Sequence, residues 1–128
     1  EAQWEYAASG GSSAMWFWGD DPAAADQYVV WKSEWPAAVM SKQPNAWGLY
    51  DTLGNVWELV ADRYDSGYYA KSPGIDPTGP DSTSGQVVRR GGTYGLNDTA
   101  QMRLAFRKGS GEGYRGLHVG FRVVAKPE

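Results

Sequence analysis

The chain contains no cysteine and one histidine among its 128 residues. Without cysteine it forms no disulfide, no zinc–thiolate site and no thiol nucleophile. The single histidine, His118, excludes a metal site built on three histidines. Ser110 lies in no Gly-x-Ser-x-Gly frame, so a serine nucleophile elbow is not expected there. The common hydrolytic and redox chemistries that depend on these groups are therefore excluded or disfavoured.

Basic residues and long apolar runs are also scarce. Twelve Lys and Arg residues against fifteen Asp and Glu residues give a net charge of −3, which does not attract nucleic acid or an anionic membrane. No apolar run approaches the about 20 residues that cross a bilayer, and the first residues lack a basic segment followed by an apolar one. We therefore expect a soluble chain without nucleic-acid or membrane partners. Its cellular compartment stays open.

Glycine and large aromatic residues are abundant instead. Seventeen Gly, seven Pro, seven Trp and eight Tyr residues favour short elements joined by long ordered loops, because a few large rings fill a core. The length suits one domain over residues 1–128. Periodicity and turn residues predict a helix and four strands, with residues 19–45 mostly in loop. These elements are Glu1–Ala8, Val56–Ala61, Gln86–Arg90, Arg103–Arg107 and His118–Ala125.

Two carboxylates flank a glycine turn in residues 51–58, which read Asp-Thr-Leu-Gly-Asn-Val-Trp-Glu. Calcium binds six to eight oxygens from carboxylates and backbone carbonyls, and a glycine turn directs carbonyls to one centre. The side chains of Asp51 and Glu58 with the carbonyls of Gly54 and Val56 are thus candidate calcium ligands. The alternative is a turn in which Asp51 and Glu58 cap backbone amides or pair with Arg63 or Arg90.

Seven segments spread along the chain resemble the formylglycine-generating enzyme family, also called sulfatase-modifying factors. They are EAQWEYAASGG (1–11), WFWGD (16–20), GLYDTLGNVWELVADRY (48–64), YYAKSPGIDPTGP (68–80), VVRRGGTY (87–94), RLAFR (103–107) and HVGFRVV (118–124). The resemblance implies an α+β, C-type-lectin-like fold with a small twisted sheet, about two helices and extensive ordered loops. It also implies structural calcium held by the four positions of the 51–58 turn.

The sequence departs from that family in two ways. Catalytic members bind copper with a pair of cysteines that oxidise a substrate cysteine, but Leu96 and Gln101 stand near those positions here. No copper and no formylglycine-generating oxidase activity are therefore expected. Members of the family usually carry further strands before the first helix. We accordingly expect an N-terminally truncated domain whose open sheet edge favours a homo-oligomer.

Two Gly-rich connections, 91–98 and 108–116, are the candidate ligand surface. In the non-catalytic branch of this fold, which includes the variable proteins of diversity-generating retroelements, the corresponding face binds ligands. By that resemblance the contact residues are Tyr94, Asn97, Asp98, Tyr114, Arg115 and His118. The expected function is a non-catalytic module that binds an unidentified protein, peptide or small molecule. The alternatives are solvated loops without a ligand, an enzyme relative with a different chemistry in the family's substrate cleft, and a structural or assembly domain.

Overall fold

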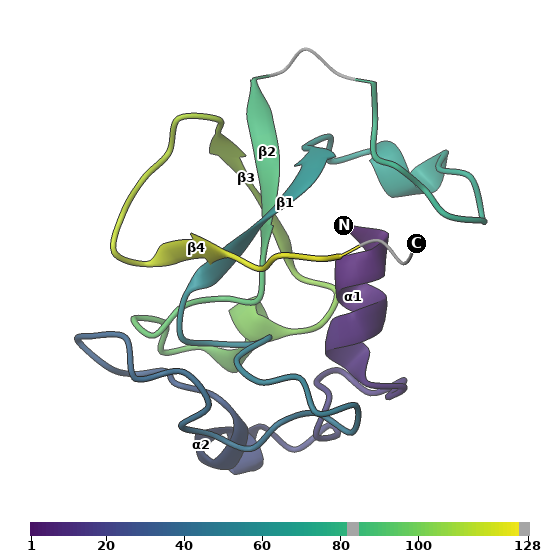
Figure 1. Cartoon of the computed structure of the whole chain (residues 1–128). Coiled ribbons are helices and arrows are strands. Elements are labelled where there is room, and N and C mark those ends of the chain that lie inside the picture. Colours follow the sequence, from purple (N-terminus) through teal and green to yellow (C-terminus); the bar gives the residue numbers. More distant parts are fainter. Residues whose placement is uncertain (82–84, 126–128) are drawn as a thin grey trace.

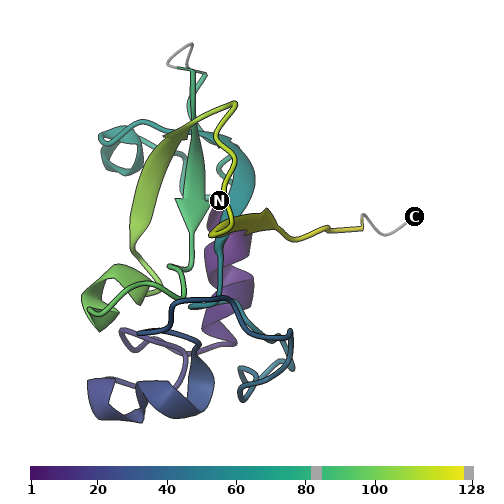
Figure 2. The ribbon, with the colours of Figure 1, turned by 90° about the vertical axis from the view of Figure 1, so that its left-hand side faces the viewer.

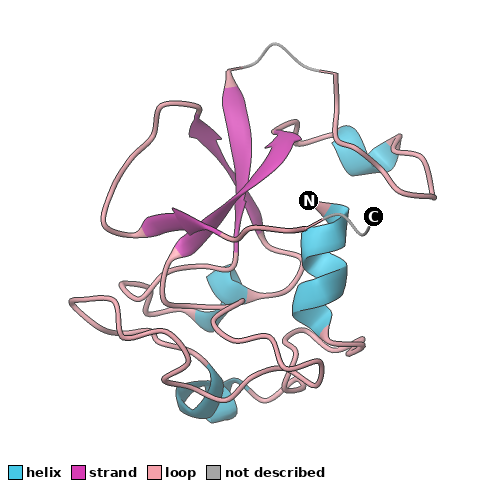
Figure 3. Cartoon of the chain, viewed as in Figure 1, coloured by secondary structure: helices cyan, strands magenta, loops and turns pink. Residues whose placement is uncertain are grey.

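A computed structural model describes residues 1–81 and 85–125 as a small curled mixed sheet with two helices and long loops (Figure 1). The predicted α+β class, with a small sheet, two helices and extensive loops, is confirmed. Most of the chain is loop, as Figure 3 shows. The elements in order are α1 (Ala2–Ser9), η1 (Pro22–Ala24), α2 (Ala25–Tyr28), β1 (Trp57–Arg63), η2 (Tyr68–Ala70), β2 (Gln86–Arg90), η3 (Thr99–Met102), β3 (Arg107–Gly111) and β4 (Val119–Phe121).

The sheet has the strand order β3-β2-β1-β4. Strands β1, β2 and β3 pair antiparallel, and β4 pairs parallel to β1. Because successive strand residues point to opposite faces, the face carrying Glu58 and Arg90 contacts α1, and we call it the inner face. The opposite, outer face carries the row Phe121, Leu59, Arg89 and Lys108, which are direct partners across the four strands.

The hydrophobic core lies mainly among loops and short helices at one end of the sheet. Its buried members are Ala8, Trp16, Ala25, Val29, Leu53, Met102 and Leu104. Trp18 stacks between Trp16 and Tyr28 at ring-centroid distances of 5.5 and 5.3 Å. Gly54 is required where the chain crosses this core, because a Cβ there would lie 2.7 Å from the Val30 carbonyl oxygen. Large rings and one close backbone crossing therefore hold a core that has little regular structure.

Two of the predicted strands are wrong in position. Residues 103–106 form a turn after η3, and β3 begins only at Arg107 and ends at Gly111, inside the predicted 108–116 connection. Met102 and Leu104 are both buried in the core, so their alternation imitates a strand. The last predicted strand, His118–Ala125, pairs only over Val119–Phe121, and the following residues extend away from the body (Figure 2). The stretch 19–45, expected to be mostly loop, contains the short elements η1 and α2.

The other predicted elements are confirmed to within about two residues. Gly10 ends α1 in the left-handed conformation with φ +58°. Strands β1 and β2 lie where residue alternation placed them. Among the described residues no helix is long and apolar enough to span a bilayer.

Candidate functional site

Two of the six candidate ligand residues meet over the outer face of the sheet. The loop from β3 to β4 places the Tyr114 hydroxyl 2.5 Å from His118 Nε2. The Arg89 guanidinium carbon lies 5.3 Å from the Tyr114 ring centroid and 5.0 Å from that of Trp57. Phe106 continues this set at 6.0 Å from Trp57. We call Phe106, Trp57, Arg89, Tyr114 and His118 the aromatic–arginine cluster.

The cluster joins rigid and exposed groups. Trp57 is buried in β1, and Arg89 on β2 is half-buried. Tyr114 keeps 38% of its surface exposed, and Arg115 beside it is also exposed. Stacking a guanidinium between aromatic rings fixes its plane and leaves its edges open for hydrogen bonds. The arrangement suits recognition of a ligand by large, well-ordered contact groups.

The other three candidates belong to a separate loop. Tyr94 donates its backbone N–H to the Asn55 carbonyl at 2.7 Å, which anchors the 91–98 loop beside the glycine turn. The Asp98 carboxylate accepts from the Ala100 N–H at 2.9 Å and so caps η3. Asn97 is exposed. Within residues 1–81 and 85–125, no hydrogen bond, ion pair or ring contact joins these three residues to the aromatic–arginine cluster.

The carboxylates of the predicted calcium turn already have protein partners. Asp51 Oδ2 accepts from the Met40 N–H at 2.7 Å. Glu58 accepts from Arg122 at 2.7 Å and 3.2 Å, one bond to each oxygen, and from Trp4 Nε1 at 2.7 Å. Glu58 therefore pairs with an arginine, as the alternative to calcium binding proposed, but that arginine is Arg122 and not Arg63 or Arg90.

This arrangement bears directly on the implied calcium ion. In the part of the chain that the structure describes, no three His, Asp or Glu side chains group closely enough to hold a metal ion. A calcium ion at Glu58 would compete with the bidentate Arg122, so the side-chain oxygens of the turn do not fit calcium as they stand. The calcium assignment stays a prediction, as do the carbonyl ligands Gly54 and Val56.

Comparison with known proteins decides the family. Residues 1–127 match the profile of the sulfatase-modifying factor enzyme 1-like domain, the FGE-sulfatase family. The chain belongs to this family. It is 36% identical over 141 residues to the formylglycine-generating enzyme of Streptomyces coelicolor, covering 97% of this chain and 45% of that enzyme. It is also 34% identical over 127 residues to the serine/threonine-protein kinase pkn1 of Chlamydia pneumoniae, covering 97% and 20% of the two chains.

Solved structures agree with this assignment. Treponema denticola variable protein 1 superposes with a TM-score of 0.85 at 31% identity, covering 94% of this chain and 44% of the other. PvdO from Pseudomonas aeruginosa gives a TM-score of 0.80 at 26% identity, covering 94% and 48%. The chain thus spans less than half the length of these relatives. The family resemblance read from the sequence motifs and the C-type-lectin-like fold that it implied are confirmed.

The FGE-type domain departs from catalytic members at the positions near the expected cysteines. Leu96 packs against the hydrophobic core, and its carbonyl accepts from the Lys32 N–H at 2.8 Å. Gln101 lies within η3. An apolar core contact and a short helix thus occupy the segment in which the family resemblance implies a copper-binding pair.

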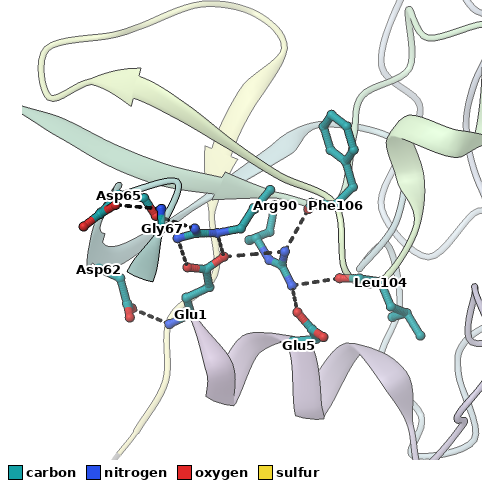
Figure 4. Close-up of polar contacts among 9 residues, drawn as sticks. Glu1, Glu5, Asp62, Asp65, Gly67, Arg90, Leu104 and Phe106 are labelled. Carbon is teal, nitrogen blue, oxygen red and sulfur yellow. Dashed lines mark hydrogen bonds and ion pairs between the residues drawn. The ribbon is translucent and has the colours of Figure 1, made fainter. Parts of the chain in front are cut away.

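A buried charge network fixes α1 to the inner face of the FGE-type domain (Figure 4). Arg90 is fully buried, pairs with Glu5, and donates to the Leu104 and Phe106 carbonyls at 2.7 and 2.8 Å. Glu1 accepts two hydrogen bonds from Arg107 at 2.7 and 2.8 Å. Burial alone lowers the pKa of Arg107, but the hydrogen bonds and charge of Glu1 outweigh it and raise that pKa above its ordinary value.

Sequence reasoning missed three members of the outer-face cluster, namely Trp57, Arg89 and Phe106. A signal for Arg89 was present in the pair Arg89-Arg90 within a strand, because alternation must place one of the two arginines on each face of the sheet. Nothing in the sequence shows that the β3–β4 loop folds back so that Tyr114 reaches Arg89.

Proposed function

We propose that this FGE-type domain is a non-catalytic binding module whose ligand contacts the outer face of the sheet. The observation that carries the proposal is the aromatic–arginine cluster, in which the exposed Tyr114 and its partner His118 are ordered against Arg89 and the buried Trp57. Tyr and Arg are the residues that most often dominate binding energy at protein interfaces. Their ordering before binding lowers the entropy lost when a ligand docks.

Two further observations support a binding role. The sequence offers no cysteine for the oxidase chemistry of the family, and Leu96 near the expected position is a half-buried leucine that packs against the core. The structural relative from Treponema denticola is named a variable protein, which favours a non-catalytic role for the shared scaffold. The chain shares about 31% of its residues with that protein, so we carry over the class of role and no particular ligand.

The competing proposal is an enzyme that performs a different reaction in the substrate cleft of the family. A cavity of about 430 Å³ lies between α1 and β1, and its lining includes Trp4, Val60, Arg122 and Glu1. Its charged groups are already paired, Arg122 with Glu58 and Glu1 with Arg107. These ion pairs hold the charged groups of the cavity in fixed contacts, whereas the outer-face cluster keeps Tyr114 exposed, so binding at the outer face is the better supported function.

A selection from a random dodecapeptide library tests the proposal. Peptides that bind the wild-type chain are measured again with Tyr114→Ala, with His118→Ala and with the control Tyr6→Ala, which changes an exposed tyrosine on α1. We expect affinity to fall about tenfold or more with the first two variants and to be unchanged with the control. Peptides that bind all four chains equally well would overturn the proposed site.

A further inference from the structure

Strands β2 and β3 carry two pairs of like charges placed directly opposite each other. In the register of the sheet, Arg90 lies directly opposite Arg107, and Arg89 lies directly opposite Lys108. Because adjacent residues alternate in direction, the first pair lies on the inner face and the second on the outer face. Like charges directly opposite in an antiparallel sheet destabilise it unless a counter-charge is present. Each pair therefore destabilises the sheet unless an anionic group lies beside it.

The inner pair has its counter-charges within the chain. Glu5 pairs with Arg90, and Glu1 lies between Arg90 and Arg107, 3.5 Å from the first and 2.7 Å from the second (Figure 4). Two carboxylates thus neutralise two arginines, and two backbone carbonyls satisfy further donors of Arg90. On the inner face, the carboxylates of Glu1 and Glu5 therefore offset the like charges of Arg90 and Arg107.

The outer pair has no such partner within residues 1–81 and 85–125. Neither Arg89 nor Lys108 takes part in an ion pair there. Glu112, the acidic residue in the β3–β4 loop, is already paired with Arg63. The Arg89 Nε atom is buried and has no hydrogen-bond partner among the described residues; the same is true of Arg90 Nε, so the difference between the two faces lies in the carboxylates alone. The outer face therefore holds two adjacent cations whose counter-charge the described part of the chain does not supply.

The surroundings of these cations add an apolar contact. The row across the outer face runs from Phe121 through Leu59 to Arg89 and Lys108, and Phe121 is 76% exposed. Neighbouring strands lie about 4.8 Å apart, so Phe121 and Arg89 are separated by about 10 Å across the sheet. An extended peptide covers that distance in about three residues. A ligand with an apolar residue three positions from an acidic one would span the row.

We propose that the outer face binds an acidic peptide segment of a protein partner, with a carboxylate between Arg89 and Lys108 and an apolar side chain on Phe121. Arg115, which follows Tyr114 in the β3–β4 loop, is exposed. A carboxylate there supplies the hydrogen bonds and counter-charge that Glu1 supplies on the inner face. This inference rests on the proposed binding function and names the chemical class of its ligand.

The probe is the fluorescein-labelled peptide Leu-Gly-Ser-Glu-Glu, titrated with the full chain by fluorescence polarisation. The amide twin Leu-Gly-Ser-Gln-Gln tests the carboxylates, and Ser-Gly-Ser-Glu-Glu tests the apolar residue. We expect the acidic peptide to bind about tenfold more tightly than its amide twin, and to weaken as salt rises. Inorganic phosphate is titrated as a competitor, because a bare oxyanion site would take it equally well.

Two matched charge reversals complete the test. Lys108→Glu places a carboxylate opposite Arg89, so we expect the melting temperature to rise by about 4 °C while binding of the acidic peptide falls at least tenfold. Lys71→Glu makes the same change in net charge at an exposed lysine of the η2 segment, and it should leave peptide binding unchanged. A gain in stability with a loss of binding identifies the pair, because misfolding would lower both.

Four results would overturn the inference. Equal binding of the acidic peptide and its amide twin excludes the carboxylate. Displacement of the peptide by phosphate at equal concentration shows an oxyanion site without peptide recognition. Unchanged binding with Lys108→Glu excludes this pair as the site. Library peptides that depend on Tyr114 but show no preference for acidic residues would overturn the ligand class and leave the proposed binding function standing.

Discussion

Removing Arg122 isolates the charge of Glu58 at the glycine turn. Glu58 on β1 has a side chain only 7% exposed, and Arg122 bonds both of its oxygens. Arg122 follows β4 and is 35% exposed. In Arg122→Gln the Glu58 carboxylate loses both hydrogen bonds from Arg122 and keeps the one from Trp4 Nε1. The variant therefore measures what a buried carboxylate costs once its cation is gone.

The expected loss follows from the burial of the pair. Removing one partner of a fully buried ion pair costs about 3–5 kcal/mol, and the partial exposure of Arg122 reduces this to about 2–3 kcal/mol. Unfolding entropy is about 2.1 cal/mol/K per residue, or about 270 cal/mol/K for 128 residues. A loss of 2.5 kcal/mol then lowers the melting temperature by about 9 °C.

A double-mutant cycle separates the charge effect from lost packing. The free energy of unfolding is measured in urea for Glu58→Gln, Arg122→Gln and the double variant. We expect the double variant to be more stable than the sum of the single losses predicts, by about 1–3 kcal/mol, because it leaves no unpaired charge. Additive losses, or an Arg122→Gln melt within about 2 °C of wild type, would refute the reasoning.

The same variants test calcium at this turn. A ligand held only by the folded state at 100 times its Kd adds about 2.7 kcal/mol to stability. Because Arg122 competes for the same oxygens, we expect calcium to raise the melting temperature of Arg122→Gln more than that of wild type, and to leave Glu58→Gln unchanged. Coincident melts in calcium and in chelator for all three chains, with no calcium found by elemental analysis, would contradict calcium binding.

Three further predictions concern other parts of the molecule. Arg90→Met should cost about 3–5 kcal/mol in urea unfolding because it removes the buried partner of Glu1 and Glu5 and the donors to the Leu104 and Phe106 carbonyls, and a loss below about 1 kcal/mol would contradict the buried network. Burial, then the charge of Glu1, raises the pKa of Tyr69 to about 12, so its stabilising contribution is present below pH 10 and is lost as pH rises through 12. Ultraviolet titration should show a phenol that ionises near pH 12 and that Tyr69→Phe removes, and a titration unchanged by Tyr69→Phe would contradict this. Among the described residues β4 lies at an edge of the sheet, and with the 82% exposed Val123 this predicts self-association. Val123→Asp should shift sedimentation toward monomer, and a wild-type monomer at all concentrations would contradict this.

Local patterns were enough to predict α1, β1 and β2. Each has a periodic run with clear turn residues, and each lies within about two residues of its predicted bounds. The segment 103–107 misled because alternating burial arises in an irregular chain whenever every second side chain reaches the core. The strand after His118 was predicted too long because its apolar residues Val123 and Val124 are exposed, at 82% and 85%.

The candidate site was predicted in part, and the reason is sequence distance. Tyr114 and His118 are four residues apart and share one loop, so their proximity follows from local geometry. Tyr94, Asn97 and Asp98 belong to another loop, and Asp98 serves as a helix cap. The prediction that they share one surface with Tyr114 depended on how two loops pack against each other, which no local pattern specifies.

The amino-acid sequence by itself determined the family, the α+β class and the absence of thiol chemistry, because these follow from motifs, periodicity and composition. It also determined that Arg89 and Arg90 lie on opposite faces of a strand. Only the tertiary structure decided which groups meet those faces. Arg122 reaches Glu58 across 64 positions because β4 lies parallel beside β1, and Arg89 meets Tyr114 because the β3–β4 loop folds back. Alternation fixes the face of a residue, but the strand order and the fold of the loops fix its neighbours.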